Sequence, residues 1–191
     1  RFDEGDFVEL AKNWRVNVIR VPIHPDLWEH YPGYLQEALD PIVGWGRTYG
    51  VYILVEWMAI GNPLTGQAMT VDWQDELPYH GNPYNPSESL ARSFLSTIAE
   101  RYKSCPWVIY GVFNEPAYIS WNEWRPVSER LVDVIRSRNP NALILVSGVN
   151  WAYDLSAVGD DPVNRPNIVY EVHPYPGKQV WDGPWDQNFG F

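Results

Sequence analysis

Apolar and polar residues are arranged along the chain so that strand-like and helix-like segments alternate. Apolar runs typical of buried strands occur at 18–23, 51–55, 108–113, 142–146 and 168–172. Apolar residues at helical spacing, which indicate amphipathic helices, occur around 7–14, 35–43, 90–102 and 124–135. This alternation predicts an α/β fold in which helices cover a parallel sheet.

Proline and asparagine mark some of the expected element boundaries. The stretch Asn85-Pro86-Ser87-Glu88 predicts the start of a helix, with the asparagine as its cap and the proline in its first position. Pro41 is expected either to kink the helix over 35–43 or to begin a new helix after Asp40. The connection over 61–85 is long, and such loops in a compact domain are usually functional or disordered.

Polar groups follow the predicted strands at their carboxyl ends. They are Arg20, Glu56, Asn114 with Glu115, Asn150 with Trp151, and His173 with Tyr175. An open nucleotide-binding sheet would have a glycine-rich turn after its first strand, and residues 21–25 contain none. Polar groups that converge from several strand ends favour a (β/α)8 TIM barrel.

Five strands are too few to close an eight-stranded barrel, so we expect the barrel to be incomplete, without its N-terminal and C-terminal strands. The chain starts at Arg1 without a methionine and stops at Phe191, which we interpret as a piece of a longer protein. Residues 1–191 would then form one partial domain. Unpaired edges of the sheet predict that this chain alone is poorly stable and inactive.

Composition excludes several classes of partner and site. The 24 acidic and 14 basic residues give a net charge of −10, which disfavours nucleic acid and anionic membranes as partners. No run of 18 apolar residues is present to span a membrane. The single cysteine, Cys105, rules out an internal disulfide and a cysteine-based metal cluster, and we expect it to act as a small apolar residue.

Aromatic residues are unusually abundant, with eleven tryptophans and twelve tyrosines. Several tryptophans fall in segments rich in polar residues, proline and glycine: Trp73, Trp121, Trp151, Trp181 and Trp185. Exposed aromatic faces of this kind suit flat sugar rings. Packing in the core remains the default for any one of them.

Glu115 is the main candidate for chemistry. It follows the apolar run 107–113, it has Asn114 as an amide neighbour, and Pro116 prevents the strand from continuing. A carboxylate at the end of a buried strand is costly to desolvate, which indicates a general acid. The alternative is a carboxylate that caps or pairs structurally in a loop.

Arg20 stands within an apolar strand and would need an anionic partner if buried. That partner is either a nucleophilic carboxylate or an ordinary ion pair with Glu56 or Glu171. Glu56 is interpreted as a brace for Arg20, with a role as a second acid as the alternative.

His173 and Tyr175 share one side of the chain by strand alternation, and they could orient a substrate hydroxyl and a second carboxylate. His24, His30 and His80 have no metal-ligand spacing, so we expect no metal and no cofactor.

Three motifs in this order resemble glycoside hydrolase family 5, the cellulase family of the (β/α)8 glycosidases. They are Arg20-Val21-Pro22, Asn114-Glu115-Pro116 and His173-Pro174-Tyr175. Further similar segments lie at 53–57 with 61–63, at 121–124 and at 149–151. The resemblance runs along nearly the whole chain and covers barrel strands two to six.

The resemblance implies a retaining hydrolase that cleaves O-glycosidic bonds of a β-1,4-linked polysaccharide, as an endoglucanase does. Glu115 would protonate the leaving oxygen and then activate water, while a second carboxylate forms a covalent glycosyl-enzyme. In this family that nucleophile is a glutamate ending strand seven, which lies beyond Phe191. Neither Glu171 nor Glu123 is assigned in its place.

The resemblance also implies which residues bind the substrate. Asn114 would bind the sugar 2-hydroxyl, and His173 and Tyr175 would contact substrate and nucleophile. Arg20 would hold the nucleophile ionised, and Trp151 would stack a sugar on the rim. By family analogy we expect an extracellular monomer.

Met58 is the main departure within the chain, because many endoglucanases of the family have histidine there in an Asp-Trp-His pattern. Met58 and the absence of strand seven keep a non-catalytic carbohydrate-binding remnant as one alternative. A β-mannanase of the same family is the other, because the segments that choose the substrate lie outside these residues. A metal-dependent hydrolase on the same barrel would require His-x-His pairs at strand ends, and the sequence has none.

Overall fold

A computed structural model describes residues 2–70 and 82–190, and its centre is one parallel sheet. Five strands lie in the order β1-β2-β4-β6-β7, and every neighbouring pair is parallel. Their bounds are Val18–Ile23, Tyr52–Trp57, Val108–Gly111, Ile144–Ser147 and Ile168–Glu171. The five predicted strands are thus confirmed, with ends shifted by one or two residues.

Helices connect these strands and pack against the sheet. The longer ones are α3 (Asp40–Tyr49), α4 (Glu88–Arg101) and α5 (Trp121–Arg136). Shorter α-helical turns are α1 (Glu4–Val8), α2 (Pro25–His30), α6 (Val149–Ala152), α7 (Gln179–Asp182) and α8 (Trp185–Asn188). Two π-helical turns, η1 (Glu9–Asn13) and η2 (Leu35–Leu39), and the 3₁₀ turn η4 (Pro176–Lys178) complete them. In the described part of the chain, no helix is long and apolar enough to cross a membrane.

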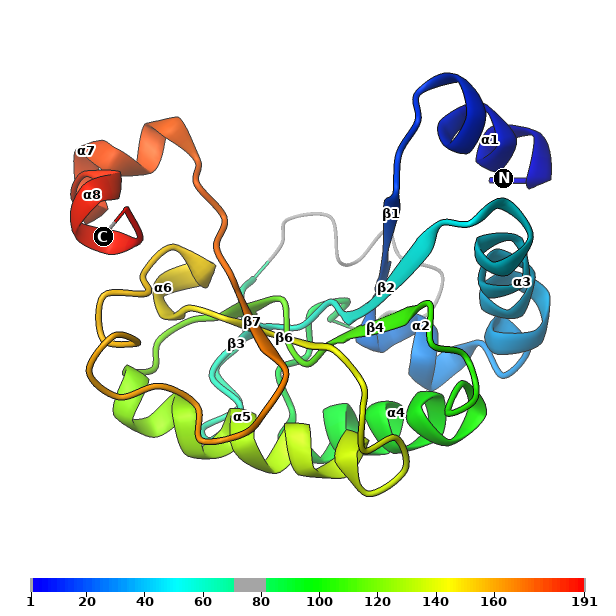
Figure 1. Cartoon of the computed structure of the whole chain (residues 1–191). Coiled ribbons are helices and arrows are strands. Elements are labelled where there is room, and N and C mark those ends of the chain that lie inside the picture. The colour runs from blue at the N-terminus through cyan, green and yellow to red at the C-terminus, as the bar shows by residue number, and fades with distance from the viewer. Residues whose placement is uncertain (1, 71–81, 191) are drawn as a thin grey trace.

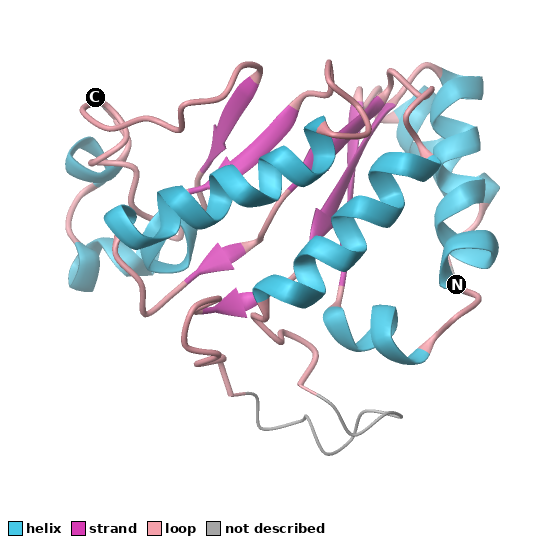
Figure 2. Ribbon diagram, turned by 90° about the horizontal axis from the view of Figure 1, so that it is seen from below, coloured by secondary structure: helices cyan, strands magenta, loops and turns pink. Residues whose placement is uncertain are grey.

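The sheet is curved, and the long helices cover only its outer face. Figure 2 shows α4 and α5 lying side by side across that face, and Figure 1 shows the opposite face open between the α1 and α7–α8 ends of the chain. An open doubly wound sheet would carry helices on both faces. Coverage of one face therefore fits part of a (β/α)8 barrel, whose inner face is enclosed by its own strands.

Strand alternation separates an apolar outer face from a mixed inner face. Ile53, Val55 and Trp57 of β2 are fully buried and belong to the core beneath the helices. Leu54 and Glu56 lie between them in sequence and point to the inner face, where Arg20 of β1 is paired in register with Leu54. The charged inner residues of neighbouring strands are thereby brought together.

The helix boundaries correct one local prediction and resolve another. Ser87, not Asn85, caps α4, because its hydroxyl accepts a hydrogen bond from the Leu90 amide at 3.3 Å. Asn85 instead accepts from the Ser87 amide at 3.1 Å, which forms the turn that leads into the helix. Pro41 lies in the first turn of α3, directly after η2. The backbone stays right-handed helical at Leu39 and Asp40, so the π-helical turn passes into α3 without a break.

Trp121 follows the default expectation of core packing. It begins α5 with a side chain that is only 5% exposed, and its indole nitrogen donates to the Asp161 carbonyl at 2.7 Å. It is a core residue rather than a loop aromatic. Trp181 is highly exposed, Trp185 is partly so, and Trp73 and His80 lie outside the described residues.

Candidate active site

Glu115 belongs to a second, very short pair of strands at the end of the main sheet. In it, β5 (Glu115–Pro116) runs parallel to β3 (Ile60–Gly61). The Glu115 amide donates to the Ala59 carbonyl at 3.1 Å, and the Ala117 amide donates to the Gly61 carbonyl at 3.0 Å. The backbone of the candidate acid is therefore fixed on both sides.

His173 stands between two carboxylates. Its Nδ1 is 2.7 Å from Glu115 Oε1, and its Nε2 is 3.1 Å from Glu171 Oε1. A neutral imidazole can donate from only one nitrogen, so two carboxylate partners favour the doubly protonated form. Burial works against that charge, but the hydrogen bonds to Glu115 and Glu171 outweigh it and raise the pKa of His173 to about 9.

Arg20 links three side chains of the inner face. Its Nε donates to Glu56, its Nη2 donates to Asn114 Oδ1, and Glu171 Oε1 lies 3.8 Å from its Nε. Burial opposes the charge, but these carboxylates raise the pKa of Arg20 and keep it charged. Of the two partners considered for Arg20, the described residues supply the ion pairs with Glu56 and Glu171.

Glu56 is completely buried, and a glycine makes its place possible. Gly111, on the neighbouring strand, has no side chain, and a Cβ there would lie 2.7 Å from Glu56 Cγ. Burial, and then the nearby charge of Glu171, raises the pKa of Glu56 to about 8, although Arg20 acts in the opposite direction. The predicted role of Glu56 as a brace for Arg20 is confirmed.

Glu171 and Ser147 are site residues that the sequence did not assign. Ser147 Oγ lies 2.6 Å from the Phe113 carbonyl oxygen and 3.2 Å from Glu171 Oε2. Burial disfavours the charge of Glu171, but its hydrogen bonds to His173 and Glu56 lower its pKa overall. Ser147 ends β6 and Glu171 ends β7. A polar residue at the carboxyl end of a strand was the sequence signal that could have identified both as site residues.

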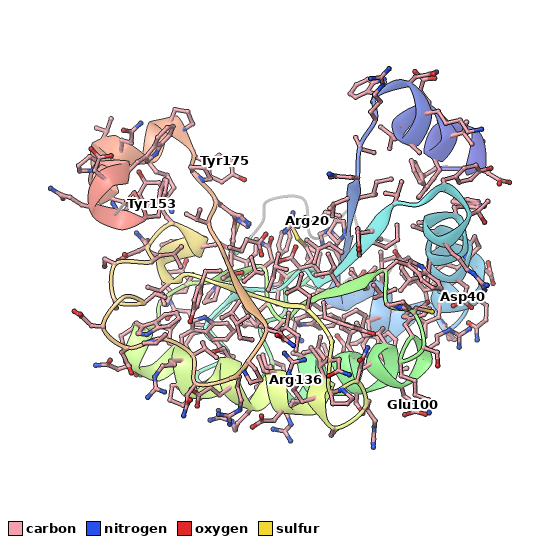
Figure 3. All side chains as sticks on the ribbon, in the orientation of Figure 1. Arg20, Asp40, Glu100, Arg136, Tyr153 and Tyr175 are labelled. Atoms are coloured by element: carbon pink, nitrogen blue, oxygen red, sulfur yellow. The ribbon has the colours of Figure 1, made fainter. Side chains whose placement is uncertain are left out.

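A pocket of about 290 Å³ opens beside these groups. It is lined by Arg20, Met58, Asn114, Glu115, Val172, His173, Pro174 and Tyr175. Five of the six predicted site residues thus line one pocket, and Figure 3 places Arg20 and Tyr175 on the open side of the sheet. A larger hollow of about 790 Å³ beside β1 is mostly apolar and does not include Glu115, so we assign the chemistry to the smaller pocket.

Trp151, the sixth predicted residue, lies outside the lining of this pocket. It lies in a left-handed turn in which Asn150, Trp151 and Ala152 have φ of 56°, 58° and 56°. Non-glycine residues avoid this region, and a run of three is held only by strong surrounding contacts. The turn therefore fixes the direction of the indole ring.

Two contacts hold the Trp151 ring. Tyr118 meets it edge to face, with ring centroids 5.0 Å apart. Lys178 Nζ lies 5.3 Å from the Trp151 centroid and 4.8 Å from that of Tyr153, and it donates to the Asn150 carbonyl at 2.8 Å. We call Tyr118, Trp151 and Lys178 the aromatic rim.

Among the described residues, no group of three or more His, Cys, Asp or Glu is arranged to hold a metal ion. His30, for example, has its Nδ1 3.1 Å from Asp26. The pocket itself presents a positioned carboxyl group next to two basic side chains and an amide.

Comparison with known proteins supplies relatives for this arrangement. The chain is 31% identical over 179 residues to endoglucanase Z of Dickeya dadantii and 28% identical over 183 residues to endoglucanase N of Pectobacterium atrosepticum. These alignments cover 93% and 91% of the chain but only 38% and 37% of the relatives. The chain thus spans little more than a third of the length of these relatives.

A solved structure agrees over almost the whole chain. A β-glucanase from Saccharophagus degradans superimposes with a TM-score of 0.85 at 34% identity, covering 99% of this chain and 58% of that one. The match confirms that the sheet is part of a (β/α)8 barrel. The family model described as cellulase (glycosyl hydrolase family 5) matches residues 1–188, so the chain belongs to that family.

Proposed function

We propose that the protein containing this chain is an endo-acting hydrolase of β-1,4-linked glucans, with Glu115 as its general acid and base. The observation that carries the proposal is the place of Glu115, which lies in β5 just beyond the carboxyl end of β4, lines the pocket and is hydrogen-bonded to His173. Its relatives are endoglucanases, and the Saccharophagus degradans β-glucanase has been solved with cellotetraose.

A retaining mechanism assigns two tasks to Glu115. His173 holds Oε1, so the other oxygen is available to protonate the glycosidic oxygen as the bond to the leaving sugar breaks. The ionised Glu115 then removes a proton from the water that attacks the covalent glycosyl-enzyme. Such acid–base assistance typically contributes about 10²–10⁴ in rate.

The nucleophile is expected outside residues 1–191. Among the described residues that line the pocket, Glu115 is the one carboxylate. Glu56 is fully buried, and both oxygens of Glu171 are engaged by His173 and Ser147. Neither is therefore placed to attack a sugar carbon, which supports a second carboxylate from a later strand of the barrel.

Asn114 is suited to bind a sugar hydroxyl. Its Oδ1 accepts from Arg20, which fixes the amide orientation and directs Nδ2 elsewhere. Nδ2 is buried and has no hydrogen-bond partner among the described residues. We propose that it donates to the 2-hydroxyl, while Tyr175 contacts substrate and the Trp151 face stacks on a sugar.

The test uses the full-length protein and Glu115→Gln on carboxymethyl-cellulose, barley β-glucan and mannan. We expect glucan hydrolysis to fall by about 10³ or more in the variant while binding of cellotetraose remains. Glu100→Gln, on the outer surface of α4, is the matched control and should retain full activity. The anomer formed first, followed by NMR, should keep the β configuration if the mechanism is retaining.

Each alternative has its own outcome. Preferred cleavage of mannan would replace the substrate assignment. Binding of glucan without hydrolysis by the unsubstituted protein would indicate a carbohydrate-binding remnant. Full activity of Glu115→Gln would remove Glu115 from the mechanism.

A further inference from the structure

The inner face of the sheet contains more buried carboxyl groups than the proposed chemistry uses. Glu56, Glu115 and Glu171 are placed with two basic groups, Arg20 and His173. Fully ionised, three carboxylates and two cations would leave one uncompensated negative charge in a largely buried site. Such a charge is costly to desolvate, so one proton is expected to remain in the cluster.

The contacts indicate where that proton lies. Glu56 and Glu171 approach the same atom, because Arg20 Nε donates to Glu56 and lies 3.8 Å from Glu171 Oε1. Two carboxyl groups this close disfavour double ionisation, and burial, followed by their interaction, raises the pKa of Glu56. Glu171 Oε1 also faces the imidazole nitrogen of His173 at 3.1 Å, and this contact stabilises its ionised form. One oxygen of Glu56 accepts a hydrogen bond from Arg20, whereas the other, Oε1, is buried and has no hydrogen-bond donor near it among the described residues.

We propose that Glu56 is a neutral carboxylic acid that donates its proton to ionised Glu171, and that this pair is a positioning device that keeps His173 doubly protonated against Glu115. The inference rests on the proposed function for its kinetic consequence only. Glu56 and Glu171 act through His173 and do not touch the substrate.

The pair of Glu56 and Glu171 keeps His173 protonated better than Glu171 alone would. A lone buried Glu171 would have to balance Arg20 and His173 together, whereas the acid proton of Glu56 supplies Glu171 with a further hydrogen bond. Glu171 therefore keeps its negative charge, and the imidazolium keeps its Nδ1 proton directed at Glu115 Oε1. The acid of the reaction is then held in one orientation.

Groups on other elements also face this cluster. Tyr84 and Lys178 interact electrostatically with Glu115. Burial, and then Glu115, raises the pKa of Tyr84, so it is neutral in the working range. Lys178 is charged there but makes no contact with His173. The protonation of His173 is thus expected to depend mainly on Glu171 and Glu115.

Two isosteric variants distinguish the members of the pair. Glutamine resembles a neutral carboxylic acid, so Glu56→Gln can still donate to Glu171 and accept from Arg20. Glu171→Gln removes the charge that stabilises the imidazolium. We therefore expect a small effect at position 56 and a large one at position 171, with Glu100→Gln as the surface control.

The direct measurement is a titration of the His173 ring nitrogens by ¹⁵N NMR in the full-length protein. In the unsubstituted protein and in Glu56→Gln, the ring should remain doubly protonated through pH 8 and titrate near 9. In Glu171→Gln, its pKa should fall by about 1 unit or more. Because this readout needs no activity, it remains decisive even if the proposed function fails.

The kinetic measurement is the pH profile of kcat/KM for glucan hydrolysis. The basic limb should move to lower pH in Glu171→Gln and stay in place in Glu56→Gln. A His173 that titrates near 6.5 in the unsubstituted protein would overturn the proposal. So would a fall of about 1 unit or more in the pKa of His173 in Glu56→Gln, and that result does not require Glu171→Gln to fold.

The pH dependence of stability gives an independent check that folding raises the pKa values of His173 and Glu56. The folded protein holds protons on His173 up to about pH 9 and on Glu56 up to about pH 8, above their ordinary pKa values of 6.5 and 4.5. Both groups therefore bind more protons folded than unfolded, and stability falls as pH rises through these ranges. The Tm should decrease from pH 6.5 to 9, and the decrease should be shallower in Glu56→Gln. An equal slope in both proteins would contradict a proton on Glu56.

Discussion

The charged cluster at the strand ends and the aromatic rim are built in different ways. The cluster of Arg20, Glu56, Asn114, Glu115, Glu171 and His173 projects from strands or from residues next to them. Within it, Arg20 is hydrogen-bonded to Glu56 and Asn114, and His173 to Glu115 and Glu171. Trp151 projects from a short left-handed turn, and a cation and a second ring hold it from outside. The sheet therefore positions the proposed chemistry, while the loops position the surface on which a sugar would lie.

This difference predicts distinct effects of mutation. A change in the cluster should affect stability and rate together, because its members are buried and mutually dependent. A change in the rim should affect substrate binding with little effect on stability. The following variants of the full-length protein test that division, from the largest expected effect to the smallest.

Arg20→Met should cause the largest combined loss. It leaves the buried Glu56 without its cationic partner, which should lower the free energy of unfolding by about 2–3 kcal/mol. Glucan hydrolysis should fall as well, because Asn114 loses the contact that orients its amide. Urea denaturation and kcat measure the two effects.

The control for that variant is Arg130→Met, which breaks a more exposed pair with Glu88. Surface pairs contribute about 0–1 kcal/mol, so its effect on unfolding should be small. Equal destabilisation by the two variants would show that the charged cluster contributes no more to the free energy of unfolding than a surface ion pair does.

Trp151→Ala should separate binding from chemistry. Loss of the stacking face should raise KM for cellotetraose about tenfold, equivalent to about 1.4 kcal/mol, with kcat nearly unchanged. Trp14, which is 71% exposed, provides the control, since Trp14→Ala should leave KM unaltered. A fall in kcat alone would place Trp151 with the cluster instead of the rim.

Lys178→Met should give the smallest effect of the series. Methionine retains much of the apolar stem but removes the charge over the two rings and the hydrogen bond to Asn150. We expect KM to rise about two- to fivefold and tryptophan fluorescence to change, because such cation–π contacts contribute about 0.5–1 kcal/mol. Lys178→Arg should restore most of the binding, whereas an unchanged KM in Lys178→Met would mean that Lys178 does not hold the rim.

The sequence predicted the cluster better than the rim for a physical reason. Parallel strands force side chains at their carboxyl ends together, so polar residues within or just after the apolar runs were enough to group Arg20, Glu115 and His173. The apolar periodicity likewise located all five strands. Glu171 was considered only as an ion partner of Arg20. Its connection to Glu115 runs through the ring of His173, which is a tertiary contact that the sequence does not show.

The remaining features have no periodic signal. The left-handed turn at 150–152 contains no glycine, and of its residues only Asn150 is of a type that tolerates a positive φ, whereas Trp151 and Ala152 give no such signal. Trp121 stands among polar neighbours, yet its position at the start of an amphipathic helix buries it. The two-residue strands β3 and β5 are too short for alternation to be visible. In each case a tertiary contact, not a local preference, decides the conformation.

The pairing of β3 with β5 has a consequence for conformational entropy. Because the amides on either side of the Glu115 side chain are held by the neighbouring segment, the backbone of the acid is ordered before any sugar arrives. Only its side-chain torsions remain to be fixed, and the His173 contact already restricts those. Ordering one residue's backbone costs about 1–2 kcal/mol, so a ligand that meets this site retains that much binding free energy for distorting its own ring.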